Sequence, residues 1–151
     1  DCKPVIEHIK KNESVLDLGS GGGFPGILVS ITRPENKISL LERNNKKCYF
    51  LKKVSYELNL KNTKIINKTI IKKNELGKFD IITSRAFATI EKTINLTEIN
   101  AHKNTKYLLL KGKASNIKKE LKDIDKNMFR YEIINQDTTK ERNIVLLCKD
   151  E

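Results

Sequence analysis

The chain has 151 residues, 38% of them hydrophobic and 32% charged, and it carries a formal net charge of +11. This length suits one domain with a full α/β core, and no apolar run approaches the roughly 18 residues of a membrane span. We therefore expect residues 1–151 to form a single domain of a soluble cytoplasmic protein, not a membrane protein, with nucleic acid as the first candidate for an anionic partner.

Apolar runs bounded by turn residues alternate with longer amphipathic stretches, which is typical of βαβ units on a parallel sheet. Helices are predicted at Asn45–Asn59, whose lysines we interpret as facing solvent, and at Ser115–Lys126, because apolar residues recur there with helical spacing. The predicted strands are Ser14–Leu18, Lys37–Leu41, Thr63–Asn67, Phe79–Ser84, Tyr107–Lys111, Arg130–Asn135 and Asn143–Cys148.

The last two strands leave little room for a helix between them, which differs from the plain dinucleotide-binding fold. This ending resembles the seven-stranded sheet of S-adenosylmethionine-dependent methyltransferases, in which the last strand inserts antiparallel. We therefore expect a Rossmann-like α/β sheet that is mostly parallel.

The first predicted strand runs into five glycines within eight residues. Glycines let the backbone take positive φ and let a ligand lie close against it. Gly21, Gly23 and Gly26 formally satisfy the GxGxxG fingerprint, so an NAD-dependent oxidoreductase is one alternative. Asp17 followed by Gly19 and Gly21 fits a methyl donor better, because S-adenosylmethionine has no phosphate and a pyrophosphate would be repelled by Asp17.

Two carboxylates flank this loop. Asp17 suits the positive end of the donor, or it braces the glycine loop by accepting backbone N–H bonds. Glu42 closes the second predicted strand, where an acid can accept both hydroxyls of a ribose in nicotinamide and methyl-donor folds alike. The alternative for Glu42 is an exposed carboxylate paired with Arg43 or Lys46.

Residues just after the fourth and fifth predicted strands should face the methyl acceptor. They lack the Asn/Asp-Pro-Pro-aromatic pattern of adenine N6 enzymes, and neither Cys48 nor Cys148 stands where a cytosine C5 enzyme needs its thiol. A guanine N7 acceptor fits this absence, because N7 loses no proton on attack and its site needs only alignment and exclusion of water. Lys111 ends the fifth predicted strand and Lys113 follows it, and both are candidate contacts to RNA.

Arg85 and Phe87 follow the fourth predicted strand. The Arg85 guanidinium can fork onto a phosphate, guanine O6 or the donor carboxylate, or it pairs with Glu91 or Asp80 at the sheet edge. Phe87 stacks on a base or belongs to the core.

The three cysteines and two histidines show no CxxC spacing and no clustering. We therefore expect no disulfide framework and no metal site, in keeping with a reducing cytoplasm. No heptad or apolar stripe demands a partner helix, so we expect a monomer.

With these residues the chain resembles the small-subunit ribosomal RNA methyltransferase G family, also called glucose-inhibited division protein B. The matching segments are Leu16–Ile27, Leu41–Leu51, Thr83–Ala88 and Leu110–Lys113. The resemblance implies a class I S-adenosylmethionine-dependent methyltransferase that methylates N7 of a guanine in 16S ribosomal RNA and releases S-adenosylhomocysteine. Its partner would be that RNA or a precursor of the 30S subunit.

The resemblance also implies roles for individual residues. Gly19 and Phe24 would line the donor pocket, and Arg85 would reach the donor or the target and act in catalysis. Ile70 and Ile71 would cover the adenine. Because Ile71 stands where the family commonly has an acidic residue, only a backbone contact to the adenine is retained there.

The family carries a helical segment before the position of Asp1, and we expect this chain to lack it. A non-catalytic RNA-binding or ribosome-assembly protein that retains the fold is the main alternative function. Asp17, the glycine loop and Glu42 argue against it, because a protein that only binds RNA has no use for a donor pocket.

Overall fold

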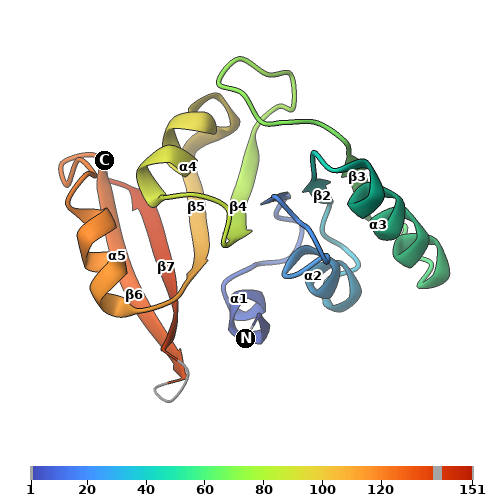
Figure 1. Cartoon of the computed structure of the whole chain (residues 1–151), viewed down its shortest axis with the longest axis horizontal. Coiled ribbons are helices and arrows are strands. Elements are labelled where there is room, and N and C mark those ends of the chain that lie inside the picture. Colours follow the sequence, from blue (N-terminus) through green and yellow to red (C-terminus); the bar gives the residue numbers. More distant parts are fainter. Residues whose placement is uncertain (1, 138–140, 151) are drawn as a thin grey trace.

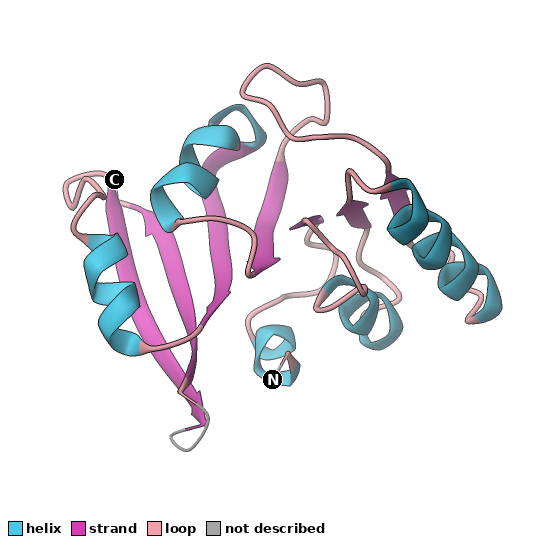
Figure 2. Ribbon diagram, in the orientation of Figure 1, coloured by secondary structure: helices cyan, strands magenta, loops and turns pink. Residues whose placement is uncertain are grey.

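The computed structural model describes residues 2–137 and 141–150 and folds them around a single sheet (Figure 1, Figure 2). The strands are β1 (Val15–Leu18), β2 (Ile38–Leu41), β3 (Thr63–Ile66), β4 (Phe79–Arg85), β5 (Ala101–Lys111), β6 (Phe129–Asp137) and β7 (Arg142–Lys149). The helices are α1 (Lys3–Glu7), α2 (Gly26–Thr32), α3 (Asn45–Glu57), α4 (Ile90–Leu96), α5 (Ala114–Leu121) and the short 3₁₀ turn η1 (Glu98–Asn100).

The sheet has seven strands in the order β3-β2-β1-β4-β5-β7-β6. The five strands β1 to β5 run parallel to one another. Strand β7 lies between β5 and β6 and pairs antiparallel with both. Both the mostly parallel sheet and the antiparallel last strand predicted from the sequence are confirmed.

Most predicted boundaries lie within about two residues of the observed ones, but the start of β5 and the end of α5 differ by more. Strand β5 begins at Ala101 and not at Tyr107, because hydrogen bonds extend it through a polar stretch that has no apolar signal. Thr105 Oγ1 accepts from the backbone N–H of His102 at 2.8 Å and donates to the carbonyl of Phe79 at 2.6 Å. Helix α5 ends at Leu121, and the following turn still buries Ile124, which explains why the helical pattern extended too far.

Side-chain alternation places an apolar cluster on each face of the sheet. In β1, which is buried throughout, Leu16 and Leu18 enter one cluster and Val15 the other. Ile117 of α5 packs in the first cluster and Leu51 of α3 in the second. Within the described ranges, no helix is both long and apolar enough to span a bilayer.

The parallel register brings the carboxyl ends of the strands to one edge of the sheet. Leu18 of β1 pairs with Leu41 of β2 on one side and with Ser84 of β4 on the other. The glycine loop, the start of α3 and the segment that leads into α4 therefore meet at this edge, which is where open α/β sheets bind ligands.

Candidate functional site

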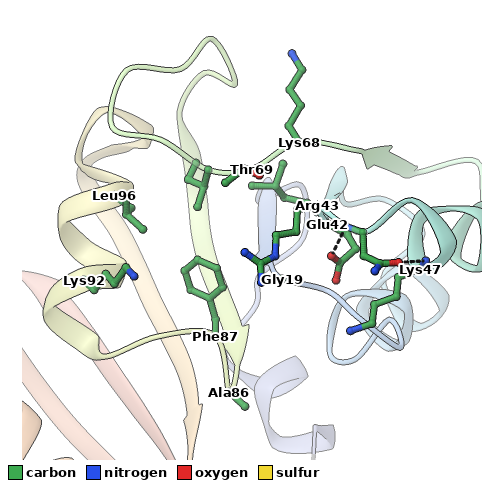
Figure 3. A pocket seen from close by; sticks show the side chains of 13 residues that line it. Gly19, Glu42, Arg43, Lys47, Lys68, Thr69, Ala86, Phe87, Lys92 and Leu96 are labelled. Atoms are coloured by element: carbon green, nitrogen blue, oxygen red, sulfur yellow. Dashed lines mark hydrogen bonds between the residues drawn. The ribbon is translucent and has the colours of Figure 1, made fainter.

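A cavity of about 550 Å³ lies at the carboxyl edge of the sheet (Figure 3). Its walls come from the glycine loop, the start of α3, the segment after β3 and the segment from the end of β4 into α4. Of the residues predicted to form the site, Gly19, Glu42, Ile70 and Phe87 line this cavity. The fold thus gathers them from four separate parts of the chain.

Gly19 is placed where only glycine fits easily. Its φ is 63°, and a Cβ added there would lie 2.9 Å from Cδ2 of Phe87. The Phe87 ring therefore packs directly on the loop backbone, and both residues line the same cavity. Stacking of Phe87 on an RNA base stays a prediction.

Gly21 and Gly22 leave open backbone in the glycine loop, whereas Gly23 and Gly26 are closely packed. A Cβ on Gly22 would meet nothing within 4 Å, and one on Gly21 would meet only the carbonyl of Gly19 at 3.7 Å. A ligand can therefore lie against this backbone without displacing a side chain.

Asp17 is fully buried at the end of β1 and does not line the cavity. Its Oδ2 accepts a hydrogen bond from the backbone N–H of Gly26 at 3.0 Å, and a Cβ on Gly26 would approach this oxygen to 2.6 Å. Burial raises the pKa of the Asp17 carboxyl to about 7, against the lowering effect of that hydrogen bond. Of its two predicted roles, the structure places Asp17 in the one that braces the loop.

Glu42 ties the glycine loop to the start of α3. Its Oε1 accepts from the N–H of Gly21 at 3.1 Å and its Oε2 from the N–H of Asn44 at 2.9 Å. An ionised carboxylate has about four acceptor positions, so acceptor capacity remains for two ribose hydroxyls. In the part of the chain that the structure describes, Glu42 forms no ion pair with Arg43 or Lys46.

Like Asp17, the predicted donor contacts Gly21, Phe24 and Ile71 lie outside the cavity lining. Gly21 faces Glu42 through its N–H, whereas Phe24 and Ile71 are exposed. Ile70 is buried and lines the cavity, whereas the next residue, Ile71, is exposed and does not line it. Contacts from Phe24 and Ile71 to the donor stay predictions.

Arg85 ends β4 in an exposed position and lines a neighbouring cavity of about 500 Å³. Ala86 belongs to both cavities, so the two are adjacent. Asp80 binds Ser14 and His102 instead of Arg85, and within the described residues Arg85 has no ion-pair partner. Its guanidinium is therefore available to a ligand.

Lys111 also lines the second cavity, but its ammonium is engaged within the chain. Its Nζ lies 2.5 Å from the carbonyl of Ala88 and 3.0 Å from Oε2 of Glu120. The same Oε2 accepts from the N–H of Ile90 at 2.9 Å. Lys111 thus fixes the segment that carries Phe87, while its predicted contact to RNA stays untested.

Lys113 is more accessible than Lys111. Its side chain is 62% exposed and forms a 3.4 Å ion pair with Glu141. Such a surface pair holds the side chain only weakly, so Lys113 stays a candidate contact to RNA.

Four cationic side chains in the first cavity were not predicted from the sequence. They are Arg43, Lys47, Lys68 and Lys92. Only the strand order brings Lys68 and Lys92 to the same cavity, because they lie far apart in the chain. Lys47 lies in the helix whose lysines we interpret from the sequence as facing solvent, and in the structure it is exposed and also lines the cavity.

Metal-ligating side chains do not gather anywhere in the described residues. Residues 2–137 and 141–150 contain no group of three or more His, Cys, Asp or Glu side chains placed to hold a metal ion.

Comparisons of the sequence and of the structure with known proteins both find methyltransferases. Residues 1–145 match the family described as rRNA small subunit methyltransferase G (GidB). The ribosomal RNA small subunit methyltransferase G of Borrelia hermsii is 36% identical over 148 residues, covering 97% of this chain and 70% of that protein. The protein of the same name from Ruthia magnifica is 41% identical over 112 residues, covering 74% of this chain and 55% of that protein.

A solved structure shows the same fold at low sequence identity. A SAM-dependent methyltransferase from Aquifex aeolicus superposes with a TM-score of 0.77 at 15% identity, covering 99% of this chain and 89% of that chain. The fold is thus that of class I methyltransferases. The chain itself spans between about half and about 70% of the length of the two curated relatives.

Proposed function

Because the chain belongs to the rRNA small subunit methyltransferase G family, we propose that it transfers a methyl group from S-adenosylmethionine to N7 of a guanine in 16S ribosomal RNA. Its setting is the cytoplasm, and its partner is the RNA or a precursor of the 30S subunit. The observation that supports this proposal most is the cavity in which Gly19, Glu42 and Phe87 meet at the carboxyl edge of the sheet.

The residues of this cavity fit the proposed donor. Glu42 has acceptor positions left for ribose hydroxyls, and Ile70 and Leu96 give the cavity an apolar wall for a base. Gly21 and Gly22, which follow the lining residue Gly19 in the chain, offer open backbone beside the cavity. When bound, S-adenosylmethionine supplies an electrophilic methyl group on its sulfonium. Asp17 stabilises the conformation of the loop by accepting a hydrogen bond from the N–H of Gly26.

The acceptor side requires positioning and no general base. Guanine N7 has a lone pair in the plane of the base and loses no proton, so alignment and exclusion of water are the contributions expected of the protein. Arg85 lies in the adjacent cavity with no ion-pair partner among the described residues. We assign it to an RNA phosphate, guanine O6 or the donor carboxylate, because a cation directly against N7 would oppose the positive charge that methylation creates there.

A methyl-transfer assay tests this function. Radiolabelled S-adenosylmethionine is incubated with the protein and with 16S RNA or 30S particles that lack the modification, and we expect label at a guanine N7. A version extended by the N-terminal segment of a relative is assayed in parallel. Label on another atom, or no transfer by either version, would contradict the proposal.

The Arg85→Ala variant tests the catalytic assignment. We expect transfer to fall by about 100-fold, the scale of a lost positioning contact, while the thermal unfolding midpoint stays within a few degrees because Arg85 is exposed. Arg85→Lys keeps the charge and loses the paired donors, so it separates the two contributions. Near-normal turnover of Arg85→Ala would remove Arg85 from the mechanism.

Calorimetry separates the remaining alternatives. Micromolar binding of S-adenosylmethionine is expected for the enzyme. Absence of binding would favour a non-catalytic assembly protein, and binding of NAD in its place would favour an oxidoreductase.

A further inference from the structure

Four cations surround the donor cavity, and we call them the cation ring: Arg43, Lys47, Lys68 and Lys92. They come from the end of β2, from α3, from the segment after β3 and from α4. In Figure 3, Arg43 and Lys92 reach towards the cavity, while the long side chain of Lys68 extends away from it. All four side chains are exposed.

The cation ring has no internal countercharge. Over residues 2–137 and 141–150, none of its members forms an ion pair, whereas the less exposed Lys106 and Lys111 each pair with a glutamate. Glu42 is the one acid that lines this cavity in the described structure, and both of its oxygens already accept backbone hydrogen bonds. The cavity therefore carries a clear excess of positive charge.

Binding of the donor does not by itself explain this excess of positive charge in the cavity. S-adenosylmethionine carries a sulfonium, an ammonium and a carboxylate, so its net charge is positive, and like charges at this distance repel. An RNA backbone, with one negative charge per nucleotide, is the anionic partner that the proposed function places at this edge of the sheet.

We propose that the cation ring contacts RNA phosphates across the mouth of the donor cavity and thereby couples RNA binding to donor binding. This inference rests on the proposed function, since it takes S-adenosylmethionine as the donor and RNA as the acceptor. Bound phosphates neutralise the ring and remove its repulsion of the donor, so RNA raises the affinity for S-adenosylmethionine. By linkage, the donor raises the affinity for RNA by the same factor.

S-adenosylhomocysteine has lost the sulfonium and is neutral overall, so it lacks this electrostatic coupling. RNA is therefore expected to favour the donor over the product at the same site.

The first test measures RNA binding alone. In the full chain, Lys68→Gln/Lys92→Gln is compared with Lys37→Gln/Lys103→Gln, which removes the same charge from two exposed lysines near the starts of β2 and β5, at the opposite edge of the sheet. A fluorescent 16S RNA transcript is the probe, titrated at several salt concentrations. The ring variant should bind about 10-fold more weakly, with a salt slope lower by about 0.7 to 0.9 for each lost phosphate contact.

The second test measures coupling by calorimetry. For the wild-type chain and the control variant, the RNA transcript should tighten binding of S-adenosylmethionine several-fold at low salt and leave S-adenosylhomocysteine within twofold. In Lys68→Gln/Lys92→Gln the tightening should disappear, while the affinity for S-adenosylmethionine without RNA stays the same or rises.

Each contrary outcome is distinct. Equal RNA binding by the ring and control variants would overturn the proposal, and so would a loss of donor affinity without RNA, which would assign the ring to the donor. If NAD or ADP bound to the ring in place of RNA, the proposal would fail as well. Failure of methyl transfer with intact, ring-dependent RNA binding would instead count against the proposed function.

Discussion

At the scale of single residues, the shape of the glycine loop depends on a buried carboxylate, Asp17, that does not line the cavity. Asp17 holds the N–H of Gly26 with Oδ2, and Oδ1 has no hydrogen-bond partner in the described structure. Burying a carboxyl group in this way costs free energy when it is ionised. The glycine loop is therefore held in place by a group whose charge state changes near neutral pH.

The pKa of Asp17 leads to a testable pH dependence of stability. It is raised from 3.8 to about 7 on folding, so between these values the folded chain holds a proton that the unfolded chain has released. Its contribution to the free energy of unfolding therefore falls as pH rises through this window, by about 4 kcal/mol in all at ~1.4 kcal/mol per pKa unit. Urea unfolding of the wild-type chain and of Asp17→Asn at pH 4 to 8 measures this directly.

Asp17→Asn has no ionisable group at this position, so only the difference between the two pH profiles is compared and other titrations cancel. The variant should gain relative to the wild type as pH rises from 4 to 8. Parallel profiles would show that the folded-state pKa of Asp17 is not raised.

At the scale of elements, the segment between β4 and α4 is held in place by side chains from β5 and α5. Lys111 of β5 and Glu120 of α5 form a 3.0 Å ion pair, and together they bind the carbonyl of Ala88 and the N–H of Ile90. The side chains are 12% and 24% exposed, so solvent screens this pair less than a surface pair. Helix α5 thereby positions a segment that lines the donor cavity.

Removing the lysine should loosen this arrangement. Lys111→Met keeps the aliphatic side chain, leaves the Ala88 carbonyl without its donor and, in the described structure, leaves Glu120 with only the N–H of Ile90. The cost is about 1–3 kcal/mol in the free energy of unfolding. Lys113→Met is the matched control, because its ion pair with Glu141 is largely exposed and is worth below about 1 kcal/mol. Equal effects of the two substitutions in urea unfolding would contradict this role of Lys111.

Some of the elements that line the first cavity are predictable from the sequence alone. Strand β1 and the glycine loop have strong local signals, an apolar run and dense glycines. Helix α3 has helical periodicity and Asn44 as an N-cap, whose Oδ1 accepts from the N–H of Lys47 at 3.0 Å. Local chemistry sets the strand, the loop and the helix, so the sequence alone predicts them, whereas the capping hydrogen bond of Asn44 is an observation from the structure.

Other features depend on the tertiary structure. The start of β5 is polar, and Thr105 binds the carbonyl of Phe79. The internal partners of Lys111 come from two distant segments. Lys68 and Lys92 line the same cavity only because of the strand order. Neither periodicity nor spacing along the chain contains that information, so these parts of the site could not be predicted.

At the scale of the whole molecule, the two outer strands of the sheet are the places where strands of a second copy would pair. The edges are β3 and β6. Strand β3 has only four residues and carries the exposed Lys64, while β6 carries the exposed Arg130 and Glu132. The shortness of β3 and the charged side chains of both strands disfavour pairing with a second sheet, although β6 has nine residues. The net charge of +11 adds repulsion between copies.

We therefore propose a monomer and expect sedimentation equilibrium to give the chain mass of 17.4 kDa. The measurement is made at about 0.1 M and about 1 M salt, because the Debye length falls from about 10 Å to about 3 Å between them and removes most of the repulsion. If the edge strands prevent association, the mass is the same at both salt concentrations. A monomer at low salt that becomes a dimer at high salt would show that net charge alone keeps the copies apart, and a dimer at both would contradict the proposal.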